Sequence, residues 1–342
     1  MFDPYEQLDL NDEACAPPHL NLRIADKYLI QKLVGSGSSS RVYSAKVYPG
    51  TELVAVKILR EGNSTRIGER KLALEGSTLI EISEHKNFVS VYDFGKTEKN
   101  EPYLVLELLS GQTLKQVLKD YGKFPLDKAL DIGMEILDAL AHLHKYGIVH
   151  SSFKPADIML VDFQNKPVPE VILLDLDSVF HPQEPNLYNA ELPSEGTTYN
   201  YLSPEEAQSK TIDKRADIYV FALILYEMIT GRIPFEGNNQ LQILEAKLAS
   251  KVVPFSKAMA ELPRQSEVES ILASCLNCDP NKRPQSVEEL RDRLTALRKR
   301  TPTTKEFEVD IKNWDKLPRS AYAEADKTKD DWMTKLKKFM GS

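Results

Sequence analysis

A lysine inside an apolar strand pattern is the strongest constraint that this sequence places on its fold. The run Leu53–Leu59 reads L-V-A-V-K-I-L, with Lys57 as its one charged residue. Burying an unpaired ammonium group is costly, so this lysine must either pair with a carboxylate or point into a cleft. The fold therefore has to supply one or the other.

A glycine- and serine-rich turn lies upstream of that lysine. Tyr28–Val34 alternates like a strand and leads into Gly35–Val42, which reads G-S-G-S-S-S-R-V. Glycines allow a strand–turn–strand to bring backbone N–H groups close to phosphates, although a plain turn between two strands explains this segment alone. Because V-A-V-K follows about 20 residues later, the two segments together resemble the phosphate-covering turn and the phosphate-binding lysine of protein kinases.

A helix is predicted over Arg66–Glu84, and it offers carboxylates to the lysine. Glu75 is the first candidate partner for Lys57, and Glu81 is the second. The alternative for either glutamate is a solvated position on the helix surface. Beyond this helix the sequence predicts, in order, strands over Phe88–Phe94 and Tyr103–Leu109, a helix from near Thr113, a helix over Leu126–Tyr146, and an apolar strand at Val171–Leu174 that ends in acidic residues.

Several segments in series resemble the motifs of eukaryotic-type protein kinases. They are His150–Leu160 (HSSFKPADIML) for the catalytic loop, Asp175–Asp177 (DLD) for D-F-G, Gly196–Glu205 (GTTYNYLSPE) for the end of the activation segment, Asp217–Ala222, Gly231–Phe235, and Cys275–Pro284. The resemblance covers about residues 28–298. It implies an α+β, two-lobed protein kinase fold, with a small β-rich N-lobe that has one main helix and a larger, mainly helical C-lobe. The expected divisions are an arm at 1–26, a kinase-like domain at 27–298 with lobes at about 27–108 and 109–298, and a charged tail at 299–342.

The same resemblance implies an ATP site with Mg²⁺. Leu106 would hold the gatekeeper position, and the backbone of Glu107 to Leu109 would bind adenine. The expected nucleotide contacts are Gly35, Ser36, Gly37, Ser38, Val42, Ala55, Lys57, Glu75, Leu106, Glu107, Leu109 and Met159. The expected catalytic positions are Lys57, Lys154, Asp175 and Ser152, and the expected metal ligands are Asp157 and Asp175.

Three polar residues of the catalytic-loop motif are replaced. Ser152 stands where the family has its catalytic Asp, and a neutral hydroxyl cannot act as that base. Losing a positioned general base typically costs a factor of about 10²–10⁴ in rate, although phosphoryl transfer depends mainly on positioning and electrostatics. Asp157 stands in place of Asn and still offers a hard oxygen ligand. Ser151 replaces the arginine that usually docks a phosphorylated activation segment, so switching by phosphorylation at Thr197 or Thr198 is not favoured.

The supporting residues of the family are retained. By the resemblance, Leu79, Val91, Leu176 and His150 would form a packing column anchored on Asp217. Arg283 would pair with Glu205, and a bidentate arrangement suits a buried arginine.

Three functions are compatible with these residues. The first is a nucleotide-binding pseudokinase that acts as a signalling or binding regulator by holding a protein partner. The second is an active but unconventional Ser/Thr protein kinase that transfers the ATP γ-phosphate with Lys57, Lys154, Asp175 and Asp157. The third is another phosphoryl or nucleotidyl transfer in the same cleft.

Composition and charge bear on which partners and which cellular compartment suit the protein. A net charge of -7 argues against broad electrostatic capture of nucleic acid, and three cysteines in 342 residues fit a reducing, cytoplasmic compartment. The longest apolar run, Ile218–Ile229, is too short to span a membrane and reads as a buried helix. In the tail, Trp332, Leu336, Phe339 and Met340 recur at helical spacing beside three lysines. That segment could dock on the protein, bind a partner or make peripheral contact with an anionic membrane.

Overall fold

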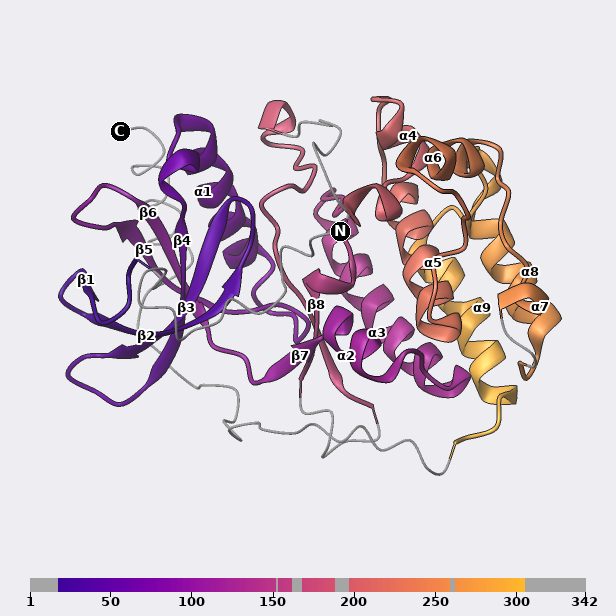
Figure 1. Ribbon diagram of the computed structural model, residues 1–342, viewed down its shortest axis with the longest axis horizontal. Helices are drawn as coiled ribbons and strands as arrows, with labels where there is room; N and C mark the ends of the chain where they lie inside the picture. Colours follow the sequence, from indigo (N-terminus) through magenta and orange to yellow (C-terminus); the bar gives the residue numbers. More distant parts are fainter. Residues whose placement is uncertain (1–17, 152, 162–167, 188–196, 259–261, 305–342) are drawn as a thin grey trace. The chain divides into compact units, whose positions relative to one another are not determined.

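The computed structural model describes residues 18–151, 153–161, 168–187, 197–258 and 262–304. It divides into two compact units. The first unit holds residues 18–83 and 89–110, and the second holds the described residues of 84–88 and 111–304. Figure 1 shows a sheet and one long helix in the first unit, and mostly helices in the second.

The first unit is built on one antiparallel sheet with the strand order β1-β2-β3-β4-β6-β5. Its strands are β1 (Arg23–Ile24), β2 (Tyr28–Ser36), β3 (Ser40–Val47), β4 (Leu53–Leu59), β5 (Val91–Lys96) and β6 (Pro102–Glu107). The helix α1 (Arg66–Glu81) is preceded by Thr65, whose side chain accepts the N–H of Gly68 and caps the helix. A short 3₁₀ turn, η2 (Glu61–Asn63), joins β4 to this helix.

The two faces of this sheet bury different residues, because side chains alternate along each strand. One face packs an aromatic and β-branched core that includes Tyr28, Tyr43, Val56 and Tyr103. The other face carries Leu59 and Leu104, which pack with Leu72 of α1. Lys57 alternates with Val56 and Ile58 in β4, so it belongs to the face that α1 covers.

The start of the described chain is attached to the sheet. β1 pairs with β2, and the buried His19 places Nε2 2.8 Å from Glu101 Oε2 and Nδ1 3.2 Å from the Tyr43 hydroxyl. Residues 18–26, which sequence analysis assigned to an N-terminal arm, therefore belong in part to this sheet. A strand of two residues is too short to give a periodic pattern.

The second unit is mainly helical, with a small sheet of β7 (Gly111–Thr113), β8 (Ile158–Val161) and β9 (Glu170–Leu173). Its helices are α2 (Leu114–Tyr121), α3 (Leu126–Lys145), α4 (Pro204–Ala207), α5 (Arg215–Thr230), α6 (Gln240–Leu248), α7 (Phe255–Ala258), α8 (Gln265–Cys275) and α9 (Val287–Arg300). Its short 3₁₀ turns are η3 (Pro155–Asp157), η4 (Pro185–Leu187), η5 (Thr197–Tyr201) and η6 (Pro280–Lys282).

Helix α5 forms the centre of the second unit. It is buried along nearly its whole length, and α3, α8 and η5 all contact it. It ends at Gly231, whose φ of 76° lies in the left-handed region where glycine carries no steric penalty. The short apolar run of the sequence therefore forms the buried core helix that was predicted.

The predicted α+β fold is confirmed, and most element boundaries agree with the sequence pattern. β4 has the predicted bounds, whereas α1 ends three residues before the predicted Glu84, because Ile82 leaves the helical ladder and caps it. β5 begins at Val91 rather than Phe88, since the N–H of Phe88 closes a turn onto the carbonyl of His85. β6 ends at Glu107, two residues earlier than predicted. Among the described residues, no helix is long and apolar enough to cross a membrane.

Candidate functional site

The first unit pairs Lys57 with Glu75, as predicted. Lys57 Nζ donates to both carboxylate oxygens of Glu75, at 2.8 and 2.7 Å. Lys57 is 6% exposed and Glu75 is 2% exposed, so the two charges compensate each other away from water. The carboxylate partner that the sequence required for Lys57 is therefore supplied by α1.

Strand register gathers other predicted nucleotide contacts on the same sheet face as Lys57. Val42 lies opposite Lys57 and also opposite Gly35, while Ala55 lies opposite Leu106. Directly opposed residues of antiparallel strands share a face. These five positions therefore form one continuous surface across β2, β3, β4 and β6.

The connection after β6 is the predicted adenine-binding segment. The N–H of Glu107 donates to the carbonyl of Ser90 at 2.9 Å, and the Glu107 carboxylate lies 3.4 Å from the Ser90 N–H. This pairing ties Glu107, the last residue of β6, to Ser90. Leu109 follows in the residues between β6 and β7.

In the second unit, Asp217 holds the catalytic-loop-like segment through its backbone. The Asp217 carboxylate is fully buried and accepts the N–H of His150 at 3.0 Å and the N–H of Ser151 at 2.6 Å. His144 Nε2 lies 2.7 Å from the same carboxylate. The start of α5 and the end of α3 thus fix the entrance of this loop.

Lys154 and Asp157 form the next contact along the loop. The Asp157 Oδ2 accepts the backbone N–H of Lys154 at 3.2 Å and its Nζ at 3.1 Å. Burial raises the pKa of the Asp157 carboxyl to about 6, the Lys154 ammonium opposes this shift, and the Asp175 carboxylate adds to it. The backbone N–H of Leu174 donates to the Asp157 carbonyl at 2.8 Å, so Asp175, the next residue, follows directly beside Asp157, the other predicted metal ligand. Met159 follows in β8, opposite Thr113 of β7.

Two residues of this region adopt a left-handed backbone that is uncommon outside glycine. Ser151 has a φ of 64° and Asp175 a φ of 61°. Such conformations persist only where the surrounding structure enforces them. Here the Asp217 carboxylate enforces the one at Ser151. Ser152, the degenerate base position, lies outside the described residues.

The predicted pair of Arg283 and Glu205 is also confirmed. The guanidinium donates to both carboxylate oxygens, at 2.7 and 2.8 Å, and both residues are buried. Because Arg283 also donates to the carbonyls of Asn277 and Arg215, it joins η6, α4 and the start of α5.

Sequence reasoning missed Lys247 of α6. This residue is 1% exposed, and its Nζ donates to the backbone carbonyls of Tyr199, Asn200 and Leu202 at 2.8 to 2.9 Å. Burial lowers its pKa to about 7, which the negative charge of Glu206 opposes. The helical pattern of α6 gives no signal that this particular lysine is enclosed.

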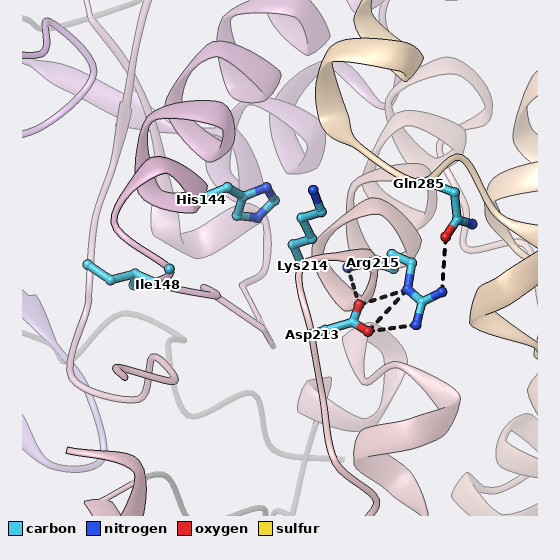
Figure 2. Close-up of a pocket in the computed structure, with 7 residues that line it drawn as sticks. His144, Ile148, Asp213, Lys214, Arg215 and Gln285 are labelled. Atoms are coloured by element: carbon cyan, nitrogen blue, oxygen red, sulfur yellow. Dashed lines mark hydrogen bonds and ion pairs between the residues drawn. The ribbon is translucent and has the colours of Figure 1, made fainter. Parts of the chain in front are cut away.

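A surface pocket of about 420 Å³ lies elsewhere in the second unit. His144, Ile148, Asp213, Lys214, Arg215 and Gln285 line it (Figure 2). Arg215 pairs with Asp213 and donates to Gln285, so much of the polar surface of the pocket is already hydrogen-bonded within the protein. The pocket contains none of the residues predicted to bind nucleotide or metal.

The carboxylates of the catalytic-loop-like region fit a magnesium ion. Asp157 and Asp175 supply two carboxylates, and Mg²⁺ is commonly bound by one or two carboxylates together with phosphates and water. The described residues hold no group of three or more His, Cys, Asp or Glu placed to bind a metal by themselves. The donor set is therefore that of a metal shared with phosphates.

A six-stranded antiparallel sheet with one main helix, a helical second unit and these contacts define a protein-kinase-like molecule. A profile of the protein kinase domain matches residues 28–294. The chain belongs to the protein kinase domain family.

Its relatives include named Ser/Thr kinases of bacteria. The serine/threonine-protein kinase PrkC of Bacillus subtilis is 31% identical over 275 residues, which cover 78% of this chain and 40% of PrkC. A probable serine/threonine-protein kinase of Clostridium acetobutylicum is 30% identical over 283 residues, covering 80% of this chain and 40% of that protein. The probable kinase PknB of Corynebacterium glutamicum is 29% identical, with 80% and 42% covered. The match spans about two fifths of the length of these relatives.

Proposed function

We propose that this protein is a nucleotide-binding pseudokinase, which binds ATP with Mg²⁺ and regulates a protein partner while transferring phosphate slowly or not at all. The observation that carries the proposal is the formed Lys57–Glu75 pair in a chain that has a serine at position 152. Protein kinases need this lysine–glutamate pair in place to act on ATP. The residue pair proposed to bind the nucleotide is thus retained in a chain that lacks the usual catalytic base.

Each retained residue has a role in this proposal. Lys57, oriented by Glu75, would bind the phosphates, and the backbone between β6 and β7 would bind adenine. Asp175 and Asp157 would hold Mg²⁺, which supplies positive charge to the phosphates. Without a cation the two carboxylates would repel ATP, so nucleotide affinity should depend strongly on divalent metal.

A second candidate is a slow Ser/Thr phosphotransferase, and the contact between Lys154 and Asp157 favours it. In this contact Lys154, which matches the lysine that touches phosphate in the family, lies beside a carboxylate oxygen of Asp157. Positioning and electrostatics supply most of the catalysis of phosphoryl transfer. The relatives named as Ser/Thr kinases support this candidate at least as well as the pseudokinase.

We also place the protein in the cytoplasm, where ATP and a reducing environment occur together. Both cysteines in the described part of the chain, Cys275 and Cys278, are free thiols. A protein partner, rather than nucleic acid, is proposed as the target of the kinase-like surface.

The test is a thermal-shift titration of ATP with and without Mg²⁺, alongside transfer of the labelled γ-phosphate in the same sample. A ligand at about 100 times its Kd stabilises the folded state by about 2.7 kcal/mol. A metal-dependent shift without transfer supports the pseudokinase. Transfer that is abolished by Asp175→Ala supports the slow kinase, and the absence of any shift overturns both nucleotide-dependent proposals.

A further inference from the structure

The glycine-rich turn is fastened to the segment that follows β4. Arg60 donates from Nε to the carbonyl of Gly37 at 2.9 Å and from its guanidinium to the Ser36 hydroxyl at 2.7 Å. The Asn63 side chain donates to the carbonyls of Ser38 and Ser39, at 3.0 and 3.4 Å. The backbone N–H of Arg60 also donates to the Ser39 carbonyl. Three consecutive carbonyl oxygens of the turn are thus held by one short segment.

Peptide geometry converts these contacts into a direction for the N–H groups. In a trans peptide unit, a carbonyl and the N–H of the next residue point to opposite sides. Because the carbonyls of residues 37, 38 and 39 point towards Arg60 and Asn63, the N–H groups of residues 38, 39 and 40 point away from them. Successive N–H groups turned to one side form a concave surface that binds anions.

The Gly37 carbonyl is held by Arg60 from the face of the sheet opposite Lys57. Arg60 continues the alternation of Val56 and Ile58, which pack in the core on the other face. Its charge also acts on the Tyr43 hydroxyl of that core: burial raises the pKa of Tyr43, and the positive charges of Arg41 and Arg60 oppose the rise. Arg60 therefore holds the turn from the face opposite Lys57.

Folding alone does not require glycine in this turn. A Cβ at Gly35 would come no closer than 3.6 Å to Val42, and one at Gly37 would lie 3.8 Å from the Ser40 carbonyl, both ordinary contacts. Neither glycine has a positive φ. The missing side chains therefore suit the close approach of a ligand to the backbone.

We propose that Arg60 and Asn63 are positioning residues for nucleotide phosphates: they hold the glycine-rich turn by its carbonyl oxygens, so that its N–H groups face a phosphate chain on the Lys57 side. This assignment rests on the proposed function. It deepens that function by naming what shapes the turn in this chain. Arg60 acts through the turn and not by touching the nucleotide.

The test compares ATP with adenosine, which shares the base and sugar but has no phosphate. Binding of each is measured by calorimetry, in Mg²⁺, for wild type, Arg60→Ala, Arg60→Lys and Asn63→Ala. We expect Arg60→Ala to weaken ATP binding by about tenfold and to leave adenosine within about twofold, the effect of one to two lost hydrogen bonds. Arg60→Lys keeps the charge but lacks the fork that bonds two oxygens, so it should restore only part of the ATP affinity.

Arg66→Ala is the matched control, because it removes an exposed arginine at the start of α1, close in sequence to Arg60. Its ATP affinity should stay within about twofold of wild type. Unchanged ATP affinity in Arg60→Ala, equal losses for ATP and adenosine, or full recovery in Arg60→Lys would each overturn the assignment. Wild type that binds neither ligand would overturn the proposed function itself, and the assignment with it.

Discussion

The Lys57–Glu75 pair and the loop around His150 are held by opposite kinds of contact. In the pair, one side chain binds another, and both charges are buried. In the loop, Asp217 binds the backbone N–H groups of His150 and Ser151. Every residue except proline carries such an N–H, so this support does not depend on which side chains the loop presents.

The difference decides what each region says about function. Replacing one member of the buried pair leaves an uncompensated charge, so each of Lys57 and Glu75 stabilises the fold as long as the other is present, apart from any contact with a nucleotide. The loop can exchange its side chains while keeping its backbone support. The retained pair in the first region therefore bears on stability as well as on nucleotide binding, whereas the serine at position 152 bears directly on catalysis.

The largest effect is expected from returning a carboxylate to the loop. If Ser152 is the main chemical deficit, Ser152→Asp should raise γ-phosphate transfer by about 10²–10⁴-fold, because a positioned base contributes that much. Ser152→Asn is the control, since it has nearly the same size and no basic oxygen. Equal rates in the two variants would show that another replaced residue limits transfer.

Breaking the buried pair should cost stability. Lys57→Ala and Glu75→Ala are each expected to lower the free energy of unfolding by about 3–5 kcal/mol, because each strands the partner charge. The double variant Lys57→Met/Glu75→Leu should recover most of that loss and still bind no ATP. Urea denaturation measures all three, and a double variant as unstable as the singles would contradict the argument from charge.

Much of this fold follows from local pattern. The apolar run of α5, the bounds of β4 and the series of motif segments are all visible in the sequence, and so are Glu75 as the partner of Lys57 and Glu205 as the partner of Arg283. The elements and the Lys57 pair depend on periodicity or on a residue whose burial demands a partner, whereas the motif segments and the Arg283–Glu205 pair depend on the resemblance to protein kinases.

Most of the missed contacts bind backbone carbonyl oxygens. Lys247 reaches three carbonyl oxygens, and Arg60 and Asn63 reach three more, but a carbonyl has no residue identity that a sequence could display. His19 anchors residues that lack a periodic pattern. Such contacts appear only when the chain is folded.

Removing the support of the loop should cost less than breaking the buried pair. Asp217→Ala leaves two buried N–H groups without their acceptor, and the expected loss is about 2–4 kcal/mol in the free energy of unfolding. Asp217→Asn should lose less, because one carbonyl oxygen remains. A loss below about 1 kcal/mol in the alanine variant would show that Asp217 does not hold the loop.

Magnesium binding should weaken in acid. Burial raises the pKa of the Asp157 carboxyl from 3.8 to about 6, so in the folded protein this carboxyl carries a proton below about pH 6. Binding that proton stabilises the folded state, and this contribution is lost as the pH rises from about 4 to 6. Metal binding requires the carboxylate and so has the opposite dependence, with affinity falling by up to about tenfold per pH unit below 6. This pH dependence is tested by measuring the Mg²⁺ concentration needed for ATP binding at pH 7.5 and at pH 5.

Asp157→Asn is the control for that measurement, because the amide oxygen is a metal ligand that does not titrate in this range. Its Mg²⁺ requirement should change less than that of wild type between the two pH values, because only the titration of the ATP phosphate, which both proteins share, remains. The same slope in Asp157→Asn and wild type would assign the pH dependence to another group.

The smallest expected effect, a gain in stability, tests whether the conformation of the loop depends on its side chains. Ser151 combines a φ of 64° with a buried hydroxyl that has no hydrogen-bond partner among the described residues. Ser151→Gly relieves both, and the free energy of unfolding should rise by about 1 kcal/mol. Ser209→Gly is the matched control, because Ser209 has a φ of 51° but is exposed. The difference between the two variants isolates the buried hydroxyl. A loss of stability in Ser151→Gly alone would show that this side chain supports the loop, so that the backbone contacts to Asp217 would not be sufficient to hold it.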